Sequence, residues 1–326
     1  MNNNSVIKKG MYEWWWHHMT AYHKKTRKSK SFYIEFFLME GKYGMLKIGC
    51  WAENSRQQNK QISVFFTPEE CFASKKQMNV KFFKNKLFFA NASNTRLKGH
   101  IFQNESPGRK NLYSDKGRVT FHILVHKFKN YKTTDIYFPT KLIPMYWYIG
   151  GLYTEYSGEI VWDDEIYELI PTQSFGYQDK NWGYNYSKPW LWLQSSCIRH
   201  NGKIIPRAAF SCGGCTPFRW DLLGHHVIFT CNIPKIFSFD INFTRLKFDE
   251  YKFEWKDKSR WILTIKNKLY DIKLNIQCPE YGITKIHYET PKGELRNVYN
   301  SGIGRGSLQI NNTIFQIEHC GVEYSL

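Results

Sequence analysis

The chain has 326 residues, enough for two domains of ordinary size or for one large β domain. A composition of 42% hydrophobic and 17% aromatic residues supports a packed core and excludes wholesale disorder. The formal net charge of +18 leaves three interpretations open: a nucleic-acid binder, a protein that rests on anionic membranes, or a basic composition without a target.

The first predicted elements are aromatic strands around a basic segment. Met11–His18 contains three consecutive tryptophans, followed by His17 and His18, which a strand would direct to opposite faces and so away from a shared metal ion. We interpret the basic cluster at 23–30 as a solvated loop. A contact with anionic lipid, or with phosphate backbones, is a less favoured alternative. Ser31–Glu40 and Met45–Trp51 then form a predicted hairpin.

Short strands separated by turns continue to the end of the chain, which predicts an all-β protein built of barrels or sandwiches. The cleanest alternation is at Tyr270–Gln277, where apolar and polar residues exchange at every position, as in a half-buried strand. Tryptophans, a loop and an aromatic strand recur in both halves of the chain. This weak internal echo favours two related β domains in tandem, at residues 1–150 and 151–326.

The eight cysteines are scattered, and Met1–Thr20 lacks the apolar run of a secretory signal. We therefore expect reduced thiols and a cytoplasmic location, with peripheral contact with a membrane left open. No segment approaches the roughly 20 apolar residues of a membrane-spanning helix.

Two motifs have spacings that could support chemistry, but for each of them we favour a structural role. Cys212-Gly-Gly-Cys215 has redox or metal spacing, but one such pair supplies only half of a tetrahedral site, so a strand bend is favoured and no metal is expected. Gly302-Ile-Gly-Arg-Gly306 lacks the strand-then-helix context of a phosphate loop, which favours a β-bulge or a barrel corner.

The most informative stretch is Gly176–Gln194, GYQDKNWGYNYSKPWLWLQ. A charged, turn-like head precedes an aromatic tail in which Trp190, Trp192 and Gln194 occupy alternate positions and so one face of a strand. An acid, a base, an amide and several indoles therefore occur within a few residues.

The acid of this stretch has two competing interpretations. Asp179 and Lys180 would diverge in a strand but could share a site in a tight turn. A carboxylic acid in an aromatic pocket has its pKa raised by desolvation and can deliver a proton, while indole and phenol faces stabilise the cation that forms. The alternative is an ion pair and a tryptophan that fix a strand corner.

The second half of the chain resembles the tocopherol cyclase family. The similarity rests on Gly158-Glu159-Ile160, on Asp163–Tyr167, on the Gly176–Gly183 run, on Trp190–Gln194 and on the terminal Gly321-Val322-Glu323-Tyr324. One departure from the family is that Asp179 stands where the plant-type motif usually has Glu.

The resemblance implies two lipocalin-like β-barrel domains around a pocket for a hydrophobic ligand. It also implies an enzyme that protonates a prenyl double bond and lets a phenol oxygen capture the cation, with no organic cofactor and no metal. On this hypothesis Asp179 donates or positions the proton and Lys180 is its charge partner, and Asn181 and Gln194 orient a hydroxyl. The pocket wall is formed by Tyr177, Trp182, Trp190 and Trp192.

Two further hypotheses stay open beside the cyclase. One is a lipocalin-like carrier that binds a hydrophobic ligand without turnover. The other adds docking on anionic membranes, driven by the +18 charge, as the route to such a ligand. No nucleic-acid partner is expected.

Overall fold

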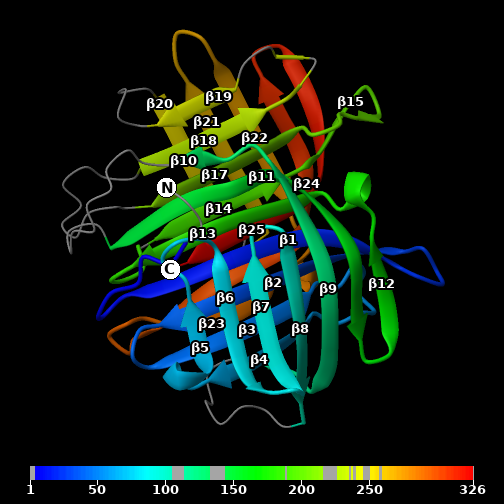
Figure 1. Cartoon of the computed structure of the whole chain (residues 1–326). Helices are drawn as coiled ribbons and strands as arrows, with labels where there is room; N and C mark the ends of the chain where they lie inside the picture. The colour runs from blue at the N-terminus through cyan, green and yellow to red at the C-terminus, as the bar shows by residue number, and fades with distance from the viewer. Residues whose placement is uncertain are drawn as a thin grey trace. The chain divides into compact units, whose positions relative to one another are not determined.

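The computed structural model consists almost entirely of β-strands, as expected from the sequence (Figure 1). The helical segments among the described residues are short 3-10 turns at Pro68–Glu70 (η1), Pro171–Gln173 (η2) and Glu280–Gly282 (η4). No helix in this part of the chain is long and apolar enough to cross a membrane. The structure describes residues 4–104, 114–132, 144–187, 189–215, 226–234, 236–237, 240–244, 250–256 and 259–325.

The first sheet has the order β4-β3-β2-β1-β12-β11-β9-β8-β7-β6-β5, with β13 paired to both β1 and β11. All strand pairs of this sheet whose register is defined are antiparallel. Its strands are β1 (Tyr12–His23), β2 (Ser29–Met39), β3 (Tyr43–Cys50), β4 (Lys60–Phe66), β5 (Cys71–Ala73), β6 (Asn79–Asn85), β7 (Phe88–Ser93), β8 (Arg96–Gln103), β9 (Gly117–Phe128), β10 (Tyr131–Lys132), β11 (Met145–Trp162), β12 (Glu165–Leu169) and β13 (Gly176–Gly183).

The second sheet has the order β19-β18-β17-β14-β25-β24-β22-β21-β20, with β15, β16 and β23 attached beside it. Its strands are β14 (Trp190–Ser195), β15 (Cys197–His200), β16 (Lys203–Ile204), β17 (Ala209–Cys215), β18 (His226–Asn232), β19 (Ile241–Thr244), β20 (Glu250–Lys256), β21 (Arg260–Lys266), β22 (Asp271–Gln277), β23 (Thr284–Glu289), β24 (Leu295–Ile310) and β25 (Thr313–Ser325).

The chain forms two compact units, and each unit is built from three separate stretches of the sequence. The first comprises Met1–Cys50, Lys60–Tyr186 and Ile286–Arg296, and the second comprises Trp51–Asn59, Ser187–Lys285 and Asn297–Leu326. The boundary expected at residue 150 falls inside β11, a strand that is continuous from Met145 to Trp162. The change of unit after Tyr186 differs from that expectation, because β11 and β13 complete the sheet begun by β1.

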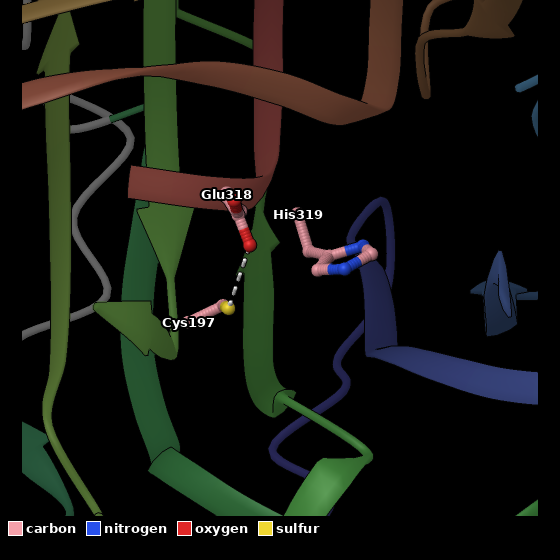
Figure 2. Close-up of side chains that lie close together, drawn as sticks. All are labelled: Cys197, Glu318 and His319. Atoms are coloured by element: carbon pink, nitrogen blue, oxygen red, sulfur yellow. Dashed lines mark hydrogen bonds between the residues drawn. The ribbon is translucent and has the colours of Figure 1, made fainter. Parts of the chain in front are cut away.

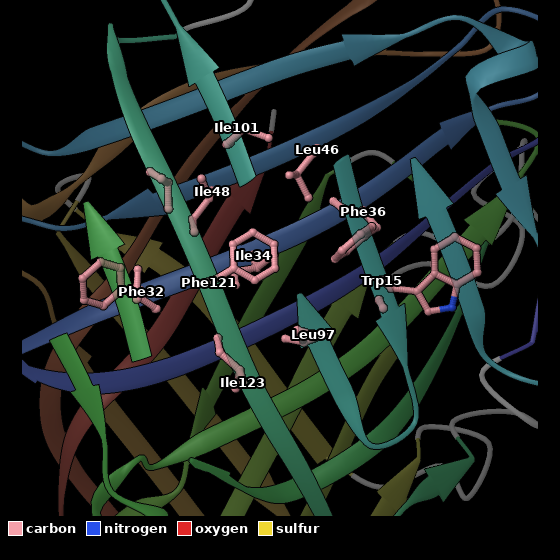
Figure 3. Packing of buried hydrophobic residues seen from close by; sticks show 14 of the residues in the cluster. Trp15, Phe32, Ile34, Phe36, Leu46, Ile48, Leu97, Ile101, Phe121 and Ile123 are labelled. Carbon is pink, nitrogen blue, oxygen red and sulfur yellow. The ribbon is translucent and has the colours of Figure 1, made fainter. Parts of the chain in front are cut away.

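The core of the first unit lies inside its curled sheet (Figure 3). Alternate residues of β2 and β3 point inward, among them Ile34, Phe36 and Ile48. They meet inward residues of β8 and β9 such as Leu97 and Phe121, which also belong to this buried cluster. One face of these strands therefore fills the interior of the unit. The side chains on the opposite face of β1, β2 and β13 form the region described in the next section.

The second unit has the alternation that was predicted most clearly. In β22, Ile272, Leu274 and Ile276 are buried while Lys273 and Gln277 are exposed, which confirms the half-buried strand. The Cys212-Gly-Gly-Cys215 segment pairs in continuous register with β14 and β18, so it is a regular strand and the expected bend is wrong. All eight cysteines of the chain are free thiols.

Candidate active site

Strand β13 carries the run that was singled out in the sequence, and every residue of Gly176–Gly183 is buried. The expectation of a turn-like head is wrong, because β13 pairs with β1 on one side and with β11 on the other. Pairing on both edges satisfies the hydrogen-bonding groups of the β13 backbone. The strand can therefore lie in the interior of the unit together with its polar side chains. Alternation then places Tyr177, Asp179 and Asn181 on one face.

Asp179 is 3% exposed, and its two carboxyl oxygens have different surroundings. Oδ2 accepts hydrogen bonds from Trp147 Nε1 at 2.8 Å and from the Tyr177 hydroxyl at 3.1 Å. Oδ1 is buried and has no hydrogen-bond partner among the described residues. Burial raises the pKa of Asp179 to about 7, against the two hydrogen bonds, which lower it; the nearby Glu35 raises it further.

This asymmetry determines where the proton sits. The lone pairs of Oδ2 face two donors, so a proton on Oδ2 would break one of these bonds. The neutral acid therefore carries its proton on Oδ1, and the carboxylate that remains after transfer is stabilised at Oδ2 by Trp147 and Tyr177. A carboxyl group with this pKa and these contacts can act as a general acid near neutral pH.

A row of side chains crosses the sheet beside Asp179. Trp16 is paired with Asp179 across β13 and with Glu35 across β2, and Glu35 is paired in turn with Lys47 on β3. Glu35 Oε2 accepts from Lys47 Nζ at 3.1 Å and from the Tyr288 hydroxyl at 2.8 Å. The site thus contains a second buried acid, held with a buried cation.

Sequence reasoning missed Glu35, Lys47 and Trp147. A signal was present for the first two, since each is a charged residue in the middle of a strongly apolar strand. Trp147, near the start of β11, had no such signal.

Aromatic rings accompany the acid on this face. Trp16 stacks on Tyr33 with ring centroids 4.6 Å apart, and Trp14 stacks on Tyr12 and on Tyr288. Asn181 lies opposite Trp14. With its amide oriented to satisfy both neighbours, Asn181 accepts from Trp14 Nε1 at 2.9 Å and donates to a backbone carbonyl at 3.3 Å. Its amide is therefore engaged in fixing the indole.

Lys180 lies on the opposite face of β13, where alternation directs it. Its Nζ contacts Glu13 Oε1 at 3.0 Å, and both side chains are almost completely buried. The ammonium also lies 5.2 Å from the Trp15 ring and 4.9 Å from the Trp182 ring. The expected pairing of Lys180 with Asp179 is thus wrong, because neighbouring residues of a strand diverge.

Trp182 shares the face of Lys180 and stacks on Tyr146 at 5.6 Å, so it belongs to a small packed cluster with Met11 and Tyr148. It lies away from the Asp179 face. The indoles that flank the acid are instead those of Trp16 and Trp147.

A second polar group on the Lys180 face is His17. Its Nδ1 lies 2.9 Å from the Tyr156 hydroxyl, which itself donates to the Tyr177 carbonyl at 3.0 Å. The hydroxyl proton is therefore committed, so His17 Nδ1 is the donor and Nε2 carries the lone pair. Burial holds the pKa of His17 well below its usual range, and the ring is neutral. The predicted divergence of His17 and His18 is confirmed, since His18 bonds Ser31 instead.

Trp190, Trp192 and Gln194 lie on β14 of the second unit, and the alternation places them on one face as predicted. Trp190 Nε1 donates to Glu323 Oε2 at 3.3 Å. Trp192 lies over Gly321, where an added Cβ would come within 2.8 Å of the indole. The predicted site residues therefore divide into two groups, one in each compact unit.

Solved structures share this architecture at low sequence identity. Kievitone hydratase from Nectria haematococca aligns with a TM-score of 0.58 and 11% identity, over 96% of this chain and 88% of that one. A putative AttH from Nitrosomonas europaea aligns with a TM-score of 0.56 and 9% identity, over 97% and 92% of the two chains. CghA with Sch210972 aligns with a TM-score of 0.52 and 10% identity, over 100% and 94%. These likenesses confirm the expected lipocalin-like all-β fold.

No curated protein matches the sequence. A family model described as tocopherol cyclase-like matches residues 152–320, which is more than half of the chain and includes Asp179. The expectation of a tocopherol cyclase-like enzyme agrees with this match. The chain therefore belongs to the tocopherol cyclase-like family.

Proposed function

We propose that the protein catalyses proton-initiated cyclisation or hydration of a hydrophobic substrate that carries an isoprenoid double bond. The observation that supports this most directly is the Asp179 carboxyl, with a pKa raised to about 7 and a buried Oδ1 that has no partner among the described residues. Because no described residue accepts a hydrogen bond from Oδ1, the proton on this oxygen can be transferred to the double bond of a bound alkene.

The first step transfers the Oδ1 proton to one carbon of the double bond, whose π electrons form the new C–H bond. The other carbon becomes a tertiary cation, and the charge left on Asp179 is stabilised at Oδ2 by Trp147 and Tyr177. Both donors are already in place, so little reorganisation accompanies the transfer.

The second step closes the cycle. A phenol oxygen of the substrate attacks the cation and forms the C–O bond, and its proton returns to the Asp179 carboxylate. In hydration, a water molecule attacks instead and gives up its proton in the same way. Neither route consumes a cofactor, and the acid is regenerated at each turnover.

Aromatic faces support the cation between the two steps. The negative faces of indole and phenol rings stabilise a cation by about 0.5–2 kcal/mol each. Trp16 and its stacked partner Tyr33 are the rings that the sheet register places beside Asp179. We propose them, rather than Trp182, as the wall next to the reacting carbon. Trp190, Trp192 and Gln194 are kept as a separate proposal, as ligand contacts within the second unit.

The test is to incubate a prenylated hydroquinone with wild type and with Asp179→Asn, and to follow the cyclic product by mass spectrometry. Asn keeps the shape and the Oδ acceptor but has no acidic proton, so turnover should fall by at least about 100-fold. Asp164→Asn changes an exposed aspartate of the same unit and should leave turnover unchanged. Glu35→Gln tests the second acid separately.

Equal turnover by wild type and Asp179→Asn would remove Asp179 from the mechanism. A second outcome would favour a lipocalin-like binder: a lipid that copurifies with the chain, is identified by mass spectrometry, and stays unchanged after long incubation.

We also propose that the protein reaches its substrate from the cytoplasm by peripheral contact with an anionic membrane. The +18 charge supports this attraction, and a hydrophobic substrate would be concentrated in such a membrane. The mechanism requires no nucleic-acid partner.

A further inference from the structure

The second unit contains a β-bulge that brings three metal-binding side chains together. On β24, Gly304 is paired with Cys320 and Gly306 with Ile317 of β25. Glu318 and His319 therefore oppose the single residue Arg305, which is the two-against-one count of a bulge. The bulge or corner expected from the Gly302–Gly306 run is confirmed.

The bulge changes the direction of His319. In a regular strand Glu318 and His319 would point to opposite faces. His319 instead has a φ of 47°, in the left-handed region that side chains rarely adopt. Cys197 of β15 is paired directly with Glu318 and so shares its face. Figure 2 shows the Cys197 thiol directed at the Glu318 carboxylate, with the His319 ring beside them.

The distances within this cluster suit a tetrahedral ion. One ligand atom of each of Cys197, Glu318 and His319 lies within 4.8 Å of the other two, and Cys197 Sγ is 3.8 Å from Glu318 Oε2. Metal–sulfur and metal–oxygen bonds of about 2.3 and 2.1 Å at a tetrahedral angle place S and O roughly 3.6 Å apart. The observed S–O separation is therefore close to a coordination edge, and His319 has to move by about an ångström.

We propose that Cys197, Glu318 and His319 bind a divalent transition metal of the zinc class. The donor set of one thiolate, one imidazole and one carboxylate is the borderline-soft set that Zn²⁺ and Co²⁺ accept. The ion replaces the thiol proton that now lies between Cys197 and Glu318, and that proton is released to the buffer. Three protein ligands leave a fourth position for water.

A guanidinium lies against the Glu318 carboxylate of this cluster. Arg199 Nε bonds the same carboxylate at 3.0 Å and competes with the ion for it. Removing this guanidinium should therefore strengthen metal binding, an effect that no purely structural role of the cluster predicts.

The experiment uses the full-length chain, freed of metal by dialysis against a chelator and titrated with Co²⁺. Binding is read from the thiolate-to-cobalt charge-transfer band. His319→Asn removes the imidazole but tolerates the left-handed backbone, so it preserves the bulge. We expect both Cys197→Ala and His319→Asn to weaken Co²⁺ binding by at least about 100-fold, since even supporting residues cost 10–100-fold.

Two further variants make the test specific. Cys215→Ala disrupts the other cysteine pair with metal spacing and should leave the band and its midpoint unchanged. Arg199→Gln should shift the midpoint severalfold to lower Co²⁺ concentration. The proposal is overturned if wild type gives no band, if the band survives in folded His319→Asn, or if Cys215→Ala abolishes it.

Discussion

At the scale of single residues, the proposed reactivity of Asp179 depends on a difference between two oxygens of one carboxyl group. Oδ2 has two donors, and Oδ1 has none among the described residues. Desolvation keeps the acid protonated near neutral pH, while the two donors stop its pKa from rising so far that it could no longer give up the proton. Acid strength and proton position are thus set by separate contacts.

This balance predicts the pH dependence of turnover. Since the protonated acid is the reactive form, activity should be constant at low pH and fall above a pKa near 7. Tyr177→Phe removes one donor from Oδ2 and should raise that apparent pKa by roughly one unit. Both are measured as pH–rate profiles. A profile in the Phe variant that is unshifted, or shifted to lower pH, would show that the hydroxyl does not act on Asp179.

The same group predicts how stability depends on pH. The pKa of Asp179 is about 7 in the folded chain and about 4 in an unfolded one. The folded state therefore holds the proton more tightly, and the stability that this contributes is fully present below pH 4 and lost as the pH rises through 7.

Urea unfolding of wild type and Asp179→Asn at pH 4, 6 and 8 measures this contribution. The Asn variant should gain stability relative to wild type as the pH increases, because it has no charge to bury. A difference between the two chains that does not change with pH would contradict the raised pKa.

At the scale of elements, β13 separates two kinds of chemistry by the alternation of its side chains. One face presents Asp179, and the other buries the Lys180–Glu13 pair, whose members are 167 residues apart in sequence. Burial lowers the pKa of Lys180, and the charge of Glu13 opposes that shift, so the pair holds its charge only as a unit. The pair joins β1 to β13, and in the proposed mechanism it takes no part in proton transfer.

Breaking the pair should cost stability and leave the chemistry intact. Glu13→Gln leaves Lys180 as an uncompensated buried charge, which should lower the free energy of unfolding by about 3–5 kcal/mol. Adding Lys180→Met should recover most of this loss. As a control, Asp164→Asn disrupts an exposed pair with Arg118 and should cost less than about 1 kcal/mol.

Urea unfolding measures these differences, and the turnover of the double variant decides the role of Lys180. Activity close to wild type is expected, because Lys180 and Asp179 lie on opposite faces of β13. If the double variant recovers its stability but loses activity, Lys180 takes part in catalysis.

At the scale of the whole molecule, the +18 charge is the property that bears on where the protein works. Part of the basic segment at the β1–β2 turn is already neutralised. Arg27 contacts Glu168 at 2.6 Å, and Lys24 contacts the same side chain at 3.8 Å. The other basic residues are scattered along the sequence, so their attraction to a membrane should be general and sensitive to salt.

Sedimentation with vesicles tests this attraction. The protein should pellet with anionic vesicles at low ionic strength and be released at high salt, since charges separated by more than about 10 Å are screened at 0.1 M salt. Vesicles of neutral lipid are the control and should bind little at either salt concentration. Absence of binding to anionic vesicles at low salt would end the membrane proposal.

The sequence by itself determined the all-β class, the family, and the local geometry that follows from period-two alternation. It placed Trp190, Trp192 and Gln194 on one face, because alternation depends only on neighbours along the chain, and its glycines indicated a bulge or corner at Gly302–Gly306. Tertiary structure decided that Asp179 is buried between β1 and β11, that Trp147 holds it, and that Lys180 belongs to Glu13. Burial and partners depend on which distant strands pair, and strand pairing is fixed by the fold of the whole unit.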